Sequence, residues 1–188
     1  MKLLFCAFLF ISGLISPLLA QDSAKATKSP SGFRAEFLAQ MKDVEGKLQD
    51  LADAIPQEKY SWRPMDGVRS VSEVFMHIAG ANYLFPSMAG VKKPEDLAKD
   101  MEKTVTEKAK VKEQLKASFD FIRTALLNTS DADLEKPAKM FGQETTVRGL
   151  YFNAALHMHE HLGQSIAYAR MNSIVPPWTA AEQAKSKK

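Results

Sequence analysis

Apolar residues recur at steps of three and four in four stretches of this chain, which is the spacing of one face of an α-helix. The clearest stretch carries Phe33, Phe37, Met41, Val44 and Leu48. We find no run of alternating apolar and polar residues that would predict a strand. The predicted helices extend from Phe33 to a stop at Pro56, from Ser70 to the region of Pro86 or Gly90, from about Pro94 through Leu126, and from Thr145 or Thr146 to about Asn172.

Four amphipathic helices with one shared core predict an all-α protein, a four-helix bundle over residues 32–178. The start of the second helix is marked by Ser70-Val-Ser-Glu73, a capping box in which the hydroxyl and the carboxylate each pair with an otherwise unbonded amide. Residues 179–188 are polar and basic, and we expect them to form a flexible tail.

The first twenty residues have the layout of a secretory signal peptide: a basic start, an apolar run from Leu3 to Ile11, and the small residue Ala20 before a polar segment. We expect cleavage after Ala20, a linker over residues 21–31, and an extracytoplasmic mature protein, periplasmic or secreted. The alternative is an uncleaved membrane anchor. The apolar run is short for a span and Pro17 interrupts its end, so we expect no membrane contact after removal of the signal.

The composition limits the partners and the metal ligands that the protein can use. The 188 residues include 25 Lys and Arg against 22 Asp and Glu, a net charge of +3, which is too balanced for a nucleic-acid-binding protein. The single cysteine, Cys6, lies in the predicted signal, so the exported domain would have neither a disulfide nor a thiolate ligand. The four histidines are therefore the informative residues.

Three of these histidines are candidates for a metal site. On a helix, at about 100° per residue, His157 and His161 lie about 40° apart while His159 points nearly the opposite way. As a strand, all three would share one face, but the absence of turn signals around them favours the helix. His77 lies on the inner stripe of the second helix. Because three neutral imidazoles can hold one divalent ion and leave positions open, we predict a site of His77, His157 and His161, with His159 on the surface.

Simpler interpretations stand beside this one. A histidine on an apolar stripe is often a core residue with a local hydrogen-bond partner, and a bundle without any metal is one hypothesis. Asn153, Gln164 and Tyr168 project from the same side of the helix as the histidine pair and are candidates to support it. The Lys and Glu residues between positions 99 and 116 are interpreted as a solvated face.

Two segments resemble the halves of a known family. The similarity is to the DinB-like four-helix bundle family and covers roughly residues 33–178. The first segment is Tyr60-Ser-Trp-Arg-Pro64 followed by Ser70 to Ile78, and the second is His157-Met-His-Glu-His161-Leu-Gly-Gln164 continuing to Pro177. The resemblance implies that His77, His157 and His161 bind a divalent metal, often zinc or nickel. The chain departs from many members at Leu162, where they have Arg, and at Ser173, where they have Gly at the helix end.

Function is less determined than the site. One hypothesis is a metal-dependent hydrolase or transferase acting on a small molecule of unknown identity. Some relatives transfer cytoplasmic thiols, which an exported protein would not meet. A hydrolase needs a general base, and near the ligands in sequence only Glu73, which has a capping role, and Glu160 are available. The competing hypothesis is a non-enzymatic metal-binding or stress-response bundle, and whether the protein forms a homodimer stays open.

Overall fold

The computed structural model describes residues 30–187, and the predicted signal and most of the linker lie outside these residues. Four long helices form the bundle: α1 (Phe33–Ala54), α2 (Val71–Met88), α4 (Lys108–Leu127) and α6 (Val147–Met171). This confirms the predicted all-α, four-helix fold class. The shorter elements are a 3-10 turn η1 (Gln57–Lys59), α3 (Met101–Thr104), α5 (Asp131–Leu134), strands β1 (Pro137–Met140) and β2 (Gln143–Thr146), and α7 (Pro177–Ser186).

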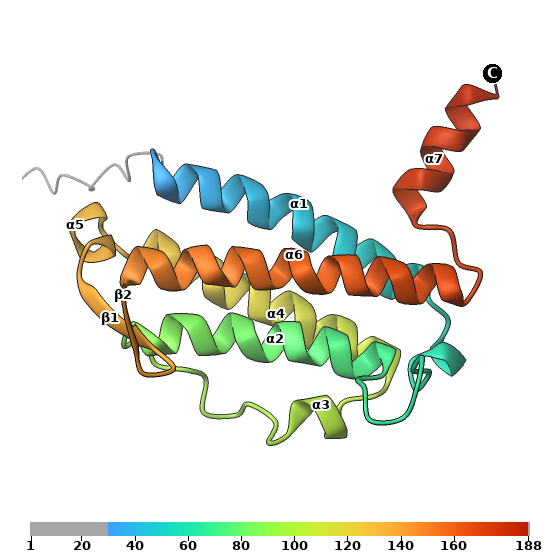
Figure 1. Cartoon of the computed structure of the whole chain (residues 1–188), viewed down its shortest axis with the longest axis horizontal. Coiled ribbons are helices and arrows are strands. Elements are labelled where there is room, and N and C mark those ends of the chain that lie inside the picture. The colour runs from blue at the N-terminus through green and yellow to red at the C-terminus, as the bar shows by residue number, and fades with distance from the viewer. Residues whose placement is uncertain (1–29, 188) are drawn as a thin grey trace, which may run out of the picture.

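The bundle has an up-down-down-up topology. In Figure 1, α1 and α6 run in one direction, while α2 and α4 run in the opposite direction. A short loop can only join antiparallel neighbours, so the parallel helices α2 and α4 need a long return connection, and this connection carries α3. None of the helices in the described residues is both long and apolar enough to cross a membrane.

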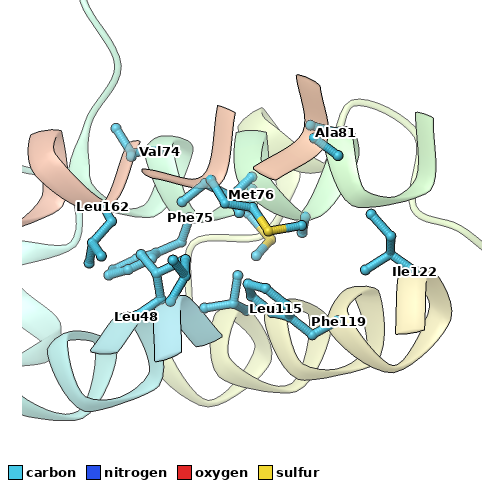
Figure 2. Packing of buried hydrophobic residues seen from close by; sticks show 14 of the residues in the cluster. Leu48, Val74, Phe75, Met76, Ala81, Leu115, Phe119, Ile122 and Leu162 are labelled. Carbon is cyan, nitrogen blue, oxygen red and sulfur yellow. The ribbon is translucent and has the colours of Figure 1, made fainter. Parts of the chain in front are cut away.

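The core lies where the four apolar stripes meet (Figure 2). The stripe predicted on α1 is buried from Phe37 to Leu51, and the one on α4 is buried from Val111 to Leu126. Burying one large aliphatic or aromatic side chain contributes about 1.5–3 kcal/mol, so these stripes are the main source of helix stability in a chain of this length. The residues labelled in Figure 2 are Leu48, Val74, Phe75, Met76, Ala81, Leu115, Phe119, Ile122 and Leu162, and all of them are buried.

The predicted third helix is wrong in its first part. The stripe of Leu97, Met101 and Val105 keeps the helical spacing, but only the single turn of α3 forms there, and α4 begins later at Lys108. The backbone is left-handed at Asp100 (φ 50°) and extended at Val105, which interrupts the helix on both sides of α3. The side chains of α3 instead contact α2.

Two other segments also differ from the expectation. Residues 137–146, expected to be loop, form an antiparallel hairpin in which Met140 pairs with Gln143. Its two-residue turn places Phe141 and Gly142 at positive φ, the conformation that matches the twist of a hairpin. Most of the C-terminal segment expected to be a flexible tail, residues 179–188, belongs to the helix α7, which projects from the end of the bundle beyond α6 (Figure 1).

Candidate metal centre

His77 reaches the centre from α2. This helix begins with the capping box that the sequence predicts: the Ser70 hydroxyl accepts a hydrogen bond from the Glu73 amide, and the Glu73 carboxylate accepts one from the Ser70 amide. The cap fixes where the helix starts and therefore which residue of the first two turns faces α6. His77 is partly buried, and its Nδ1–H donates to the Glu102 carboxylate across 2.8 Å.

His157 and His161 reach the centre from α6, one helical turn apart. Their ring centroids are 4.4 Å from each other, and the ring of His77 lies 4.8 Å from the first and 4.7 Å from the second. One ring nitrogen from each of the three side chains lies within 4.8 Å of the others. The structure thus brings together the three histidines that the sequence analysis selected, and places them where they could hold one metal ion.

The outer nitrogens of two rings are fixed by hydrogen bonds. A carboxylate only accepts, so the bond to Glu102 requires His77 to carry its proton on Nδ1. His161 likewise donates its Nδ1–H to the Gln164 carbonyl oxygen across 2.7 Å. The Nε2 atom of each ring is then an unprotonated lone-pair donor, which is the state a metal ion requires.

These two partners belong to one connected network. The other oxygen of Glu102 accepts a hydrogen bond from Arg69 Nε across 2.7 Å. On the other side, the Gln164 amide donates to the Tyr168 hydroxyl, and that hydroxyl donates to the Arg69 backbone carbonyl across 3.1 Å. Arg69 therefore joins the support of His77 to the support of His161.

The third ring is left with unsatisfied polar atoms. His157 Nε2 lies 3.0 Å from His77 Nε2, and its buried Nδ1 has no hydrogen-bond partner among residues 30–187. If His157 carries its proton on Nδ1, two lone pairs face each other; if it carries the proton on Nε2, a buried acceptor stays unpaired. Either arrangement costs about 1–3 kcal/mol. A cation among the ring nitrogens would remove the first conflict, so the donor set fits a divalent metal ion.

The electrostatics favour the neutral form of His77 and His157. Burial, together with the neighbouring rings of His161 and His77, lowers the pKa of His157 to about 4. Burial also lowers the pKa of His77, although the hydrogen bond to Glu102 opposes that change. Burial raises the pKa of Glu102, but the hydrogen bonds from Arg69 and His77 outweigh this effect and lower it overall. At neutral pH, His77 and His157 are therefore neutral imidazoles beside the ionised carboxylate of Glu102.

Other residues considered in the sequence analysis do not enter the cluster. His159 is exposed on α6 and lies within hydrogen-bond distance of a backbone carbonyl of its own helix, as the helical interpretation predicts. Asn153 donates to the Gly149 carbonyl rather than to a histidine. Glu73 is occupied by the cap and by Lys103, and Glu160 is exposed.

Glu102 is the functional residue that the sequence analysis missed. It was interpreted as one of many charged side chains on a solvated face, whereas its side chain is only 30% exposed and contacts His77. Its distance along the chain from the histidine, 25 residues, follows no helical or strand period. The one local signal is the preceding residue, Met101, which belongs to the apolar stripe and is buried in the core.

Comparison with known proteins identifies the family of this fold. A family model described as the DinB superfamily matches residues 40–165. The chain belongs to the DinB superfamily. A DinB-like protein from Bacillus cereus has the same fold, with 20% identity and a TM-score of 0.67 over 76% of this chain and 95% of that one.

Two further solved structures share the DinB fold. A DinB-like protein from Bacillus subtilis is 18% identical, with a TM-score of 0.58 over 73% of this chain and 92% of that one. A conserved protein from Enterococcus faecalis is 14% identical, with a TM-score of 0.60 over 75% of this chain and 97% of that one. No curated protein sequence matches this chain.

Proposed function

We propose that this DinB-superfamily protein binds one divalent metal ion, zinc or nickel, through His77, His157 and His161. The observation that carries the proposal is the fixed protonation of two of the rings: Glu102 and Gln164 hold the Nδ1–H groups and leave both Nε2 lone pairs unprotonated. Imidazole nitrogen suits zinc and nickel, and a site without any oxygen donor among its three ligands disfavours magnesium and calcium.

We further propose that the metal serves a hydrolase or transferase reaction on a small molecule. With three protein ligands, a bound ion of this kind keeps positions open and supplies Lewis-acid chemistry. The residues of the chain orient the site: the network from Glu102 through Arg69 to Tyr168 and Gln164 holds both supporting side chains in place.

A second candidate function is a non-enzymatic metal-binding or stress-response bundle. The observation that favours it is that both nearby carboxylates already have hydrogen-bond partners. Glu102 is occupied by His77 and Arg69, and Glu73 by Lys103 and the Ser70 amide. Neither carboxylate is available to accept a proton from a substrate unless one of these bonds breaks.

Metal analysis of untagged protein tests the site. We expect close to one transition metal ion per chain, complete loss in the His157→Ala variant, and retention in the His159→Ala variant. His159 is a matched control because it lies on the same helix but is exposed. Metal-free protein that keeps its full stability, or equal metal loss in both variants, would contradict the proposal.

Two further measurements separate the remaining alternatives. Activity toward esters, amides or thiols that disappears with each of the three histidines decides for the enzyme, and metal binding without any such activity decides for the non-enzymatic bundle. Export is proposed from the signal pattern of residues 1–20. Amino-terminal sequencing of the extracytoplasmic fraction should find Gln21 first, and a chain that retains Met1 in the cytoplasm would refute export.

A further inference from the structure

A cavity of about 600 Å³ lies beside the metal centre, next to the loop before α2 and to α3 and α6. Its wall includes Glu102 and Gln164, the two side chains that hold the Nδ1–H groups of His77 and His161. The cavity thus borders the outer side of the cluster, where the orientation of both rings is set. Its chemistry indicates what kind of molecule it would take.

The wall of this cavity has more positive than negative charge. Arg63, Arg69 and Lys103 contribute three cations, and Glu73 and Glu102 contribute two anions. Such an excess inside a concave surface attracts anions more strongly than the same charges on a flat surface, because the low-dielectric walls focus the field.

Both carboxylates are fully engaged. One oxygen of Glu102 accepts from His77 and the other from Arg69. One oxygen of Glu73 accepts from Lys103, and the other accepts from the Ser70 amide and also faces Arg63 at 3.3 Å. All four oxygens of these acids therefore have partners, and the acids present few acceptors to a ligand.

The arginines, in contrast, keep unused donors. Arg69 bonds Glu102 through Nε, and neither of its terminal Nη groups has an acceptor among residues 30–187. Arg63 donates from one Nη to the Val68 carbonyl, and within the described chain its Nε and second Nη have none. The side chain of Arg69 is 41% exposed, so its Nη groups are accessible. Planar guanidinium donors match the two oxygens of a carboxylate or a phosphate.

We propose that this cavity binds the carboxylate or phosphate group of a small molecule, with Arg69 as the main contact and Arg63 as the second. An anion held by the Nη groups of Arg69 leaves the Nε bond to Glu102 in place, so His77 keeps its orientation. If this anion belongs to the substrate of the metal centre, that substrate is a small organic acid or a phosphate ester, and this part of the inference rests on the proposed function. Anion binding itself depends only on the cavity.

Titration of the metal-free protein with succinate and with inorganic phosphate, at fixed low ionic strength, tests the site. Calorimetry gives the affinity, and the NMR signals of the arginine Nε–H groups locate the anion. We expect saturable binding of at least one anion and none of the neutral analogue succinamide. Arg69→Gln should weaken binding at least about tenfold, Arg69→Lys should recover part of it, and Arg63→Gln should also weaken it.

Arg170→Gln is the matched control, because this arginine is exposed in the last turn of α6 and its substitution removes the same charge. Equal affinity in the Arg69→Gln and Arg170→Gln proteins, or no saturable binding of either anion, overturns the proposal. Should the Arg69 variants fail to fold, wild-type affinity in Arg63→Gln overturns it.

The His157→Ala protein separates this inference from the proposed function. It should bind succinate or phosphate with the wild-type affinity, because His157 has no part in the cavity wall. Anion binding at Arg69 in a protein that never takes up metal would support the cavity and reject the proposed function. Metal uptake without anion binding would support the proposed metal site and reject the anion-binding cavity.

Discussion

The carboxylate of Glu102 accepts a hydrogen bond from His77 Nδ1–H across 2.8 Å, from a four-residue helix that lies outside the bundle core. This bond sets which nitrogen of His77 can act as a ligand. Among the described residues, it also connects the long return between α2 and α4 to the metal centre. Both consequences can be measured.

Replacement of Glu102 by Gln should weaken metal binding by about 10- to 100-fold, because the ring of His77 loses a charged partner that fixes its tautomer. Competition with a chelator of known affinity measures the change. Glu95→Gln is the control, since Glu95 lies in the same connection but, within residues 30–187, pairs only with the exposed Lys92. Equal affinities in the two variants would show that Glu102 does not support the site.

Metal release on acidification should occur at lower pH than for free imidazole. Protons compete with the metal for the ring nitrogens, and this competition begins only near the pKa of each ring. Burial lowers the pKa of both His77 and His157, to about 4 for the latter, so its protonation starts well below the ordinary value of 6.5. We expect half of the metal to be released between pH 6 and 4. Dialysis at each pH followed by metal analysis measures this release. Half-release above pH 6.5 would contradict this account.

Glu73 should make the fold sensitive to acid. Burial opposes ionisation of this carboxyl group, but the hydrogen bonds from Lys103 and the Ser70 amide and the charge of Arg63 prevail and lower its pKa to about 2. A lowered folded-state pKa stabilises the protein above the unfolded-state pKa of 4.5, and this contribution is lost as the pH falls toward 2. The full loss is about 3 kcal/mol in the free energy of unfolding.

The Glu73→Gln protein isolates this contribution, because glutamine preserves the capping geometry but has no charge. Urea denaturation of both proteins at several pH values gives the difference in unfolding free energy. We expect a difference of about 2–3 kcal/mol at pH 7 that shrinks as the pH falls from 4.5 to 2.5. A difference that stays constant over this range would mean that the charge of Glu73 does not stabilise the fold.

Ser173 follows the C-terminal end of α6 with a φ of 61°, in the left-handed region. The resemblance to the family points to Gly at this position, and the structure gives the reason: a side chain there costs about 1 kcal/mol. Ser173→Gly should therefore raise the free energy of unfolding by up to about 1 kcal/mol. Ser173→Ala keeps the Cβ atom and should bring no gain, so similar stabilities of the two variants would refute the explanation.

The parts of the structure that the sequence predicts are those governed by local periodicity. The stripe from Phe37 to Leu51 identifies α1, the Ser70 and Glu73 pair identifies the start of α2, and the four-residue step from His157 to His161 places both rings on one side of α6. The meeting of His77 with this pair follows from the inward faces of two helices. Whether the three residues bind metal stays a prediction.

The parts that sequence analysis missed are α3 and the hairpin, for two different reasons. The stripe through Leu97 and Met101 continues the helical spacing, but the helix is interrupted on both sides of α3. There Glu102 and Lys103 contact α2. The hairpin has strands of only four residues each, too short for an alternating pattern to be recognised. The conformation at α3 thus goes with contacts to a distant helix, whereas the hairpin is held by pairing within residues 137–146.

The position of the histidines on α2 and α6 has a consequence for the stability of the whole chain. His77 and His157 are 80 residues apart in sequence, so one ion shared between them would cross-link the two halves of the bundle. Such a link restricts the unfolded chain as a disulfide does, and Cys6, the only cysteine, has no second cysteine in the chain to pair with. Coordination would thus supply the cross-link that this sequence cannot form with sulfur.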